Sequence, residues 1–135
     1  MSGSKSIKFR LLLDTSAFLL IFEGVDIFEK LEDFLKEPVE FYTLQRVVDE
    51  LKQLSQRFGS RRGRAARLAL TTSMGKVKII PFKARGPVDD AIIDFLSAHP
   101  EYILVTLDAD LRRRAKDIGV RTITWWAGKR RFSKG

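Results

Sequence analysis

The residues of this chain that are best placed to do chemistry are acidic. They follow predicted strands or lie in predicted helices, and they are Asp14, Glu50, Asp89 with its neighbour Asp90, and Asp108. Each belongs to a separate segment, so folding rather than one local loop would assemble a site. Carboxylates recurring at one edge of a parallel sheet predict a divalent-metal site. An all-oxygen ligand set favours Mg²⁺ or Mn²⁺, and zinc fits poorly because the chain has no Cys and one His.

The elements that must position these acids alternate along the chain. Apolar runs predict strands over 9–13, 40–42, 77–81, 102–106 and 120–125. Helical spacing predicts helices over 16–22, 27–36, 44–54, 64–73, 89–98 and 111–118. The 59–63 stretch is predicted to break a helix and to act as a connector or a mobile basic elbow. Alternating strands and helices predict an α/β sandwich around a mostly parallel sheet, in which Asp14 and Asp108 follow the carboxyl ends of strands, where ligands bind.

Helical geometry at about 100° per residue distinguishes neighbouring acids. Glu50 lies at the rim of its helix's apolar face, whereas Asp49 points away from that face. Asp89 has apolar residues at +3, +4 and +7 and therefore shares the buried face of its helix. Asp90 is rotated away from that face, so it is the second choice as a ligand.

Helix capping offers another explanation for several of these acids. Asp is favoured at helix N-termini, and Asp14, Asp89 and Asp108 all precede or begin a helix. Asp110 also lies at a helix start, so it is either a cap or a supporting metal ligand. Glu50 lies where no cap is needed. Converging carboxylates repel one another, which favours a site that holds a cation.

The charge of the chain points to a polyanionic partner. The formal net charge is +8 and the pI is about 10.0, and basic surfaces bind nucleic acid by releasing counterions from phosphates. The basic residues form three clusters: Arg57 with Arg61, Arg62, Arg64 and Arg67; Arg112 to Lys116; and Lys129 to Lys134. Three solvated surfaces would be the plainer explanation.

Length and composition bound the class of protein. A chain of 135 residues predicts one domain, over 1–128, followed by a flexible basic tail over 129–135. With no Cys, disulfides and thiolate sites are excluded. No apolar run reaches the roughly 20 residues that span a bilayer, so we expect a cytoplasmic protein that does not bind membranes.

Four short motifs, in order, resemble the PIN-domain nucleases. They are Leu13-Asp14-Thr15-Ser16, Val48-Asp49-Glu50-Leu51, Asp89-Asp90-Ala91-Ile92 and Thr106-Leu107-Asp108-Ala109-Asp110-Leu111, followed by Gly119-Val120. The resemblance covers 9–123. It implies a PIN fold, a Mg²⁺- or Mn²⁺-dependent endoribonuclease, and ligand roles for Asp14, Glu50, Asp89 and Asp108 with Asp110 in support. Leu107 stands where many members have Asn.

A mechanism follows from the residues that the chain has and lacks. A metal-independent ribonuclease would usually need paired acid and base groups, but His99 stands alone before Pro100 and is predicted to end a helix. The hypothesis is therefore metal-assisted hydrolysis of an RNA phosphodiester that leaves a 5′ phosphate on the product. Thr15, Ser16 and Thr106 could hydrogen-bond the ligands or the phosphate, although helix capping also explains Ser16.

RNA contacts are predicted on the basic clusters. The candidates are Arg61, Arg62, Arg64, Arg67, Arg112, Arg113, Arg114, Lys129, Arg130 and Arg131. Contacts with phosphate position a substrate without selecting its sequence. Trp125 and Trp126 would either stack on bases or, as a strand-end pair, belong to the core.

Other classes of protein fit less well. A receiver domain needs an acidic pair after its first strand, and a haloacid-dehalogenase-like phosphatase needs an Asp where Ser16 stands. The serious alternative is a catalytically inert PIN-fold RNA-binding scaffold in ribosome assembly.

Within the nuclease family, two cellular roles stay open. One is pre-rRNA processing beside a ribosome-assembly factor, and the other is a VapC-type toxin bound by an antitoxin. Apolar residues of the first helices could also form a homodimer.

Overall fold

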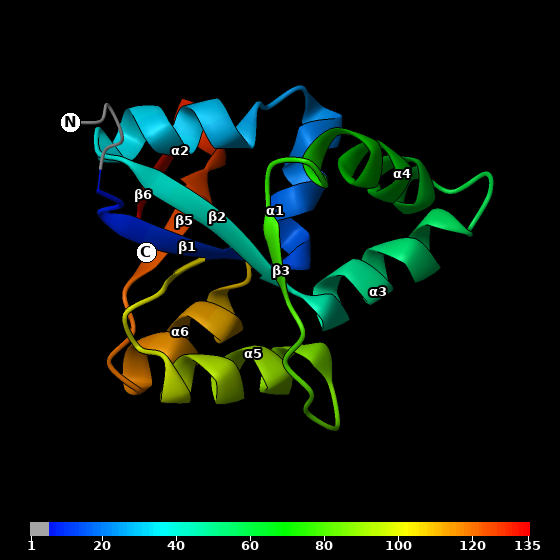
Figure 1. Cartoon of the computed structure of the whole chain (residues 1–135). Coiled ribbons are helices and arrows are strands. Elements are labelled where there is room, and N and C mark those ends of the chain that lie inside the picture. The colour runs from blue at the N-terminus through cyan, green and yellow to red at the C-terminus, as the bar shows by residue number, and fades with distance from the viewer. Residues whose placement is uncertain (1–5) are drawn as a thin grey trace.

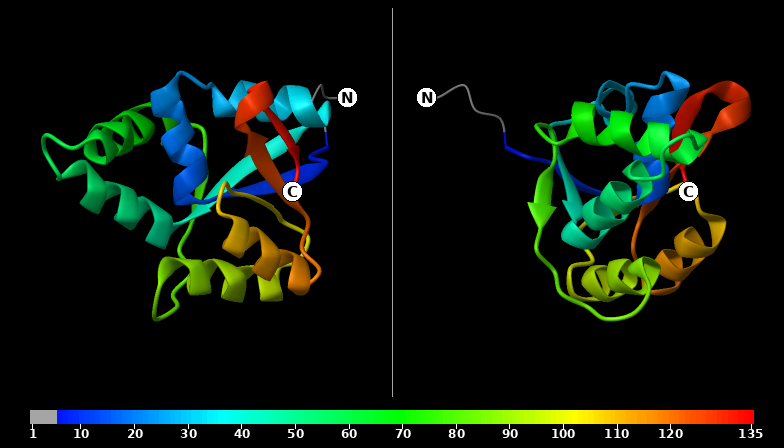
Figure 2. Two further views of the ribbon diagram at one scale, coloured as in Figure 1. Left: turned by 180° about the vertical axis from the view of Figure 1, so that it is seen from behind. Right: turned by 90° about the vertical axis from the view of Figure 1, so that its right-hand side faces the viewer.

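Six strands form one sheet between two layers of helices in a computed structural model that describes residues 6–135 (Figures 1 and 2). The strands are β1 (Phe9–Leu13), β2 (Val39–Leu44), β3 (Lys78–Ile80), β4 (Ile103–Val105), β5 (Thr122–Trp126) and β6 (Arg131–Lys134). The helices are α1 (Thr15–Leu19), α2 (Ile27–Leu35), α3 (Gln45–Ser55), α4 (Arg61–Ser73), α5 (Val88–Ala98) and α6 (Ala109–Asp117), with 3₁₀ turns η1 (Leu20–Glu23) and η2 (Ala127–Lys129). The predicted three-layer α/β fold is confirmed.

The order of the strands fixes where a site can form. The sheet runs β3-β2-β1-β4-β5-β6, and all neighbouring pairs are parallel except β5 and β6. The chain moves outward from β1 to β3 and then crosses to β4, so right-handed connections place α1 to α4 on one face and α5 and α6 on the other. Figure 1 shows α2 above the sheet and α5 and α6 below it. The direction reverses between β1 and β4, and such reversals open a crevice beyond the strands' carboxyl ends.

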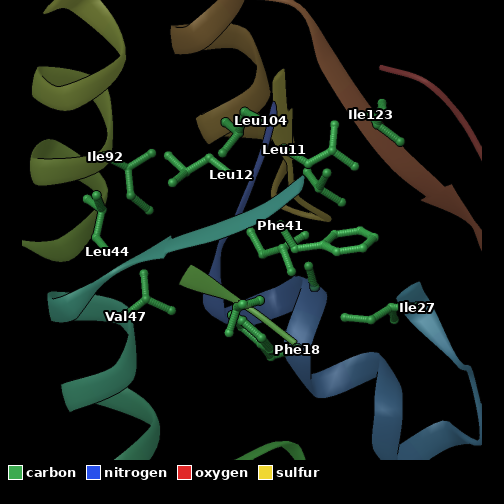
Figure 3. Close-up of a cluster of buried hydrophobic side chains, with 14 of the residues drawn as sticks. Leu11, Leu12, Phe18, Ile27, Phe41, Leu44, Val47, Ile92, Leu104 and Ile123 are labelled. Carbon is green, nitrogen blue, oxygen red and sulfur yellow. The ribbon is translucent and has the colours of Figure 1, made fainter. Parts of the chain in front are cut away.

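Side chains of alternating residues in the central strands make the two halves of the core. Leu12 pairs with Leu104 in register and packs toward Ile92 of α5, whereas Phe41 packs on the opposite face with Phe18 of α1 (Figure 3). Because both faces are covered, β1 is apolar at consecutive positions rather than at alternate ones. The core therefore holds the carboxyl ends of β1 and β4 rigidly side by side.

Helices α3 and α4 form an antiparallel hairpin at the carboxyl edge of the sheet (Figure 1). The predicted inner face of α3 is confirmed, since Val47, Val48, Leu51 and Leu54 are buried. The predicted connector is present, but it spans residues 56–60 rather than 59–63. Ser60 Oγ accepts a hydrogen bond of 2.9 Å from the backbone N–H of Gly63 and so caps α4, which begins at Arg61. Gly59 alone makes the turn, with φ of 85°.

The basic C-terminal segment is ordered, so the prediction of a flexible tail over 129–135 is wrong. Residues 131–134 form β6, which pairs antiparallel with β5 in the register Trp125 to Phe132. Phe132 is 3% exposed, and its ring meets that of Trp125 edge to face at 4.9 Å. Basic residues flank Phe132, so the sequence pattern did not indicate that this one apolar residue occupies the inward position of a short edge strand. Burial of that residue holds the segment against the sheet and α2.

Phe132→Ala is expected to lower the free energy of unfolding by about 3 kcal/mol, because it removes a buried ring and leaves a cavity beside Trp125. Urea denaturation followed by far-UV circular dichroism measures this change. Lys134→Ala, on an exposed neighbour in the same strand, should change stability by less than about 0.5 kcal/mol. Equal stability of Phe132→Ala and wild type would mean that β6 is not part of the folded core.

Among residues 6–135, no helix combines the length and the apolar character needed to cross a bilayer.

Candidate functional site

Four of the predicted acids surround one pocket at the switch point between β1 and β4. Its cavity volume is about 230 Å³, and its acidic lining is Asp14, Glu50, Asp89 and Asp108. These side chains come from the end of β1, from α3, from the first turn of α5 and from the N-cap of α6. Thr15, Ser16, Leu19, Arg62, Val88 and Ile92 complete the wall. Folding thus brings together acids that are up to 94 positions apart in sequence, from Asp14 to Asp108.

Asp14 is the most enclosed of the four acids, at 5% exposure. Its Oδ1 accepts hydrogen bonds from the Ser16 hydroxyl at 2.7 Å and from the Ala17 N–H at 3.0 Å. Its Oδ2 accepts one from the buried hydroxyl of Thr106. Asp14 itself caps α1, so the prediction that Ser16 is the cap is wrong. Ser16 instead accepts the N–H of Leu107 at 2.9 Å and so ties the ends of β1 and β4 together.

Burial raises the pKa of Asp14 from 3.8 to about 6. Desolvation of the carboxylate is the largest cause, and the hydrogen bonds from Thr106, Ser16 and Ala17 only partly offset it. The charge of Asp89 adds to the increase. The carboxylate of Asp14 is therefore held in place at a cost in free energy, which a nearby cation would relieve.

The raised pKa of Asp14 predicts a stability that falls with rising pH in metal-free protein. The folded state holds the proton up to about pH 6, whereas the unfolded state releases it near 3.8, so the stabilisation is complete below pH 4 and is lost by about pH 7. A shift of about two units corresponds to about 3 kcal/mol. Unfolding in EDTA at several pH values should show this slope in wild type, and Asp14→Asn should lack it. Parallel profiles would contradict the raised pKa.

Asp89, Glu50 and Asp108 influence one another across the pocket. The pKa of Asp89 is raised first by burial and next by the negative charges of Asp108 and Glu50. The hydroxyl of Thr15 donates a hydrogen bond to Glu50 Oε1. Asp108 Oδ1 accepts the N–H groups of Asp110 and Leu111 at 2.8 and 3.1 Å, so Asp108 caps α6 and also lines the pocket. Capping and a pocket position are thus compatible in the same residue.

Two of the predicted acids, Asp90 and Asp110, lie outside the pocket lining. Asp90 forms an ion pair of 2.9 Å with Arg114, and Asp110 forms one of 3.0 Å with Arg113. Asp110 is thereby turned toward solvent, and the structure does not bring it to the other acids. His99 ends α5 as predicted, with its ring stacked on Phe95 at 4.5 Å.

Arg46 is a positioning residue that no pattern in the sequence singled out. It lies one helical turn before Glu50 on α3, and its guanidinium donates hydrogen bonds of 2.7 Å to the Ala84 carbonyl and 2.5 Å to the Gly86 carbonyl. These bonds fasten the loop that leads into α5, which carries Asp89. Backbone carbonyl acceptors leave no signature in a sequence, so only the three-dimensional structure could reveal this contact.

The predicted RNA-binding residues differ in the contacts that their side chains already make within the protein. Arg62 lines the acidic pocket, whereas Arg112 donates a hydrogen bond of 2.9 Å to the Thr124 hydroxyl. Lys129 and Arg131 lie over the Trp126 ring at 4.9 and 5.5 Å. Arg113 and Arg114 hold the ion pairs described above, and Arg130 adopts a left-handed backbone with φ of 48°. None of the ion pairs among residues 6–135 involves Arg57, Arg61, Arg62, Arg64 or Arg67.

The donor set of the pocket fits a hard divalent cation. Buried Asp14 and mutually repelling Asp89, Asp108 and Glu50 supply oxygen ligands with excess negative charge, which Mg²⁺ and Mn²⁺ prefer. Within residues 6–135, no group of three or more acidic or His side chains is arranged closely enough to coordinate a metal ion as it stands. Carboxylates that repel one another are expected to stand apart until a cation draws them in.

Comparison with known families identifies the fold. The family model described as PIN like domain matches residues 11–127. This chain belongs to the PIN-like domain family. The match extends from the third residue of β1 to the first residue of η2, so it includes all four pocket acids of this PIN domain. No curated protein matches the chain.

Solved structures resemble this PIN domain in fold. The PIN domain endonuclease Utp24 superposes with a TM-score of 0.76 at 22% identity, covering 93% of this chain and 90% of that one. VapBC2 from Rickettsia felis, bound to a promoter DNA fragment, gives a TM-score of 0.66 at 16% identity, with 87% and 100% covered. A domain of a functionally unknown protein from Methanocaldococcus jannaschii DSM 2661 gives 0.65 at 18% identity, with 88% and 92% covered.

Proposed function

We propose that this PIN domain is a metal-dependent endoribonuclease. The observation that carries the proposal is the convergence of Asp14, Glu50, Asp89 and Asp108 on one pocket of a chain whose net charge is +8. A crevice that gathers four acids on a strongly basic protein fits a site for cations and phosphates. Membership of the PIN-like domain family supports the same reaction class.

In this proposal, the four acids would hold Mg²⁺ or Mn²⁺. The bound ion would supply Lewis-acid stabilisation of charge on the scissile phosphate and would activate water as the nucleophile. Thr106 and Ser16 keep the Asp14 carboxylate oriented through hydrogen bonds to both of its oxygens. Thr15 does the same for Glu50. Hydrolysis would leave the 5′ phosphate on the product.

Substrate positioning falls to the arginine that lines the pocket. Arg62 lies beside the four carboxylates without a carboxylate partner among the ion pairs of residues 6–135, so it is suited to bind a phosphate next to the scissile one. Arg61, Arg64 and Arg67 extend the positive surface along α4. Such contacts hold the backbone of RNA and carry no sequence information.

Two cellular roles fit this activity in the cytoplasm. One is cleavage of pre-ribosomal RNA together with an assembly factor, and the other is toxicity held in check by an antitoxin. The RNA that the enzyme cuts distinguishes the two roles. An inert scaffold that binds RNA would need the same basic surface, but RNA binding alone does not require four acids in one pocket. Self-association is compatible with either role, but Phe18 and Phe28 of the first helices are buried and are therefore not available to form the interface.

Incubation of the purified protein with structured RNA in Mg²⁺, in Mn²⁺ and in EDTA tests the proposal. Cleavage is expected with either metal and not in EDTA, and the products should carry 5′ phosphates detectable by a 5′-phosphate-dependent exonuclease. Binding of RNA without cleavage in any metal would refute the enzyme and favour the scaffold. A band pattern restricted to ribosomal precursor RNA would support the processing role.

A further inference from the structure

The loop that joins α3 to α4 presents the most exposed aromatic ring among residues 6–135. Phe58 is 82% exposed, whereas the other exposed large apolar side chains range from 38% to 46%. An isolated exposed apolar residue is ordinary on a protein surface. Phe58 differs because it lies in a basic segment of the chain and because an arginine side chain lies over its ring.

The charged residues in the sequence around Phe58 are all of one sign. Residues 51–88 include ten Lys or Arg and no Asp or Glu, and this stretch contains the loop and all of α4. The guanidinium of Arg67 lies over the Phe58 ring at 5.1 Å. Arg67 is itself fixed by a hydrogen bond of 2.6 Å to the Ser55 carbonyl. One face of the ring therefore meets a fixed cation, and most of the side chain is exposed to solvent.

The same hairpin reaches the acidic pocket. Arg62 lines the pocket and is four residues beyond Phe58, so their Cα atoms are at most about 14 Å apart. A strand whose phosphate binds Arg62 could thus place a nearby base on Phe58. Trp126 is less suited to that role, because it is 46% exposed and no residue of β5, η2 or β6 lines the pocket.

We infer that Phe58 stacks on an unpaired base of the RNA and so helps to position the strand at the acidic pocket. This inference rests on the proposed action on RNA and adds a substrate-positioning residue. An aromatic face within a positive groove is the usual arrangement for binding single strands, since each base offers a π-face that pairing would hide. Arg67 strengthens the platform by polarising the ring from its other side.

Binding in EDTA tests the inference separately from cleavage. The full-length protein is titrated with a fluorescein-labelled 12-nucleotide single-stranded RNA and with a duplex of the same length. Phe58→Ala should weaken single-strand binding about tenfold and duplex binding less than twofold, and Phe58→Trp should retain wild-type affinity. The salt dependence of binding should be unchanged, because no phosphate contact is lost. Leu68→Ala, which alters another exposed apolar residue of the hairpin, is the matched control and should bind as wild type does.

Several outcomes would overturn the inference. They are unchanged single-strand affinity of Phe58→Ala, an equal loss for duplex and single strand, and a loss in Leu68→Ala of the same size. A change in self-association of Phe58→Ala by sedimentation, with RNA affinity unaltered, would assign the ring to a protein interface instead. A failure of metal-dependent cleavage in wild type with this binding pattern intact would refute the nuclease and leave the stacking role standing.

Discussion

Asp14→Asn is expected to lower metal-dependent RNA cleavage about a thousandfold, or about 4 kcal/mol in transition-state stabilisation, while the protein remains folded. Asn is close to Asp in shape and its Oδ1 can still accept hydrogen bonds from Ser16 and Ala17. Its amide would face Thr106, whose hydroxyl can rotate to accept it and donate instead to Ser16 Oγ at 3.3 Å. The variant thus removes the charge and keeps the local geometry. Single-turnover cleavage in Mg²⁺ measures the effect.

Asp49→Asn is the matched control for that experiment. Asp49 is exposed, accepts a hydrogen bond of 2.9 Å from Gln45 and is not among the residues that line the pocket. Its variant should cleave RNA within about twofold of wild type, as expected of a surface change away from the site. If folded Asp14→Asn cleaved as fast as Asp49→Asn, the proposed role of Asp14 would be refuted. The Asn variant should also be more stable than wild type at pH 7 in EDTA, because burial penalises the charged form of Asp14.

Gly63→Ala is expected to destabilise the protein by about 3 kcal/mol, near the upper end of the usual cost of overpacking. Gly63 is buried in the first turn of α4, where an added Cβ would lie 2.2 Å from the backbone carbonyl oxygen of Arg57 and 3.0 Å from that of Leu54. Backbone atoms cannot move aside as a flexible side chain can, so the hairpin must open. Chemical denaturation measures the loss, and RNA cleavage should weaken as well because the hairpin carries Glu50 and Arg62.

Gly75→Ala separates this clash from the general effect of replacing a glycine. Gly75 follows α4, and an added Cβ there would have no atom within 4 Å. Its variant should be neutral or slightly stabilised, by less than about 1 kcal/mol, because Ala restricts the unfolded chain. Equal stabilities of the two variants would show that the α3–α4 contact at Gly63 is looser than the structure describes.

Periodicity in the sequence was enough to predict five of the six strands, the six α-helices and the class of fold. The buried strand β1 was predicted with its observed bounds, and the face of α3 that carries Val47 and Leu51 was predicted correctly. The same periodicity separated Asp89 from Asp90, which the structure places respectively at the pocket and in an ion pair with Arg114. A residue's position around a helix is a local property, so it can be read without knowing the partner elements.

The errors arose where a distant part of the chain decides the local structure. The segment with Phe132 is too charged to predict as a strand, and it is ordered because β5 offers an edge and the core accepts one ring. The supporting role of Asp110 stays a prediction, since Asp110 lies on the first turn of α6 and pairs with Arg113 three positions later. For the C-terminal segment, the deciding contact is made with β5, which local spacing does not identify.

The sequence by itself determined which residues of this chain are acidic, which faces of its helices are apolar and where its strands end. Those properties depend on the chemistry of neighbouring residues and on the geometry of one element. Only the tertiary structure decided that four of the acids share one pocket, that Arg62 joins them and that Arg46 fastens the loop before α5. Such distances depend on how sheet and helices pack together, which is set by the whole core rather than by any one segment.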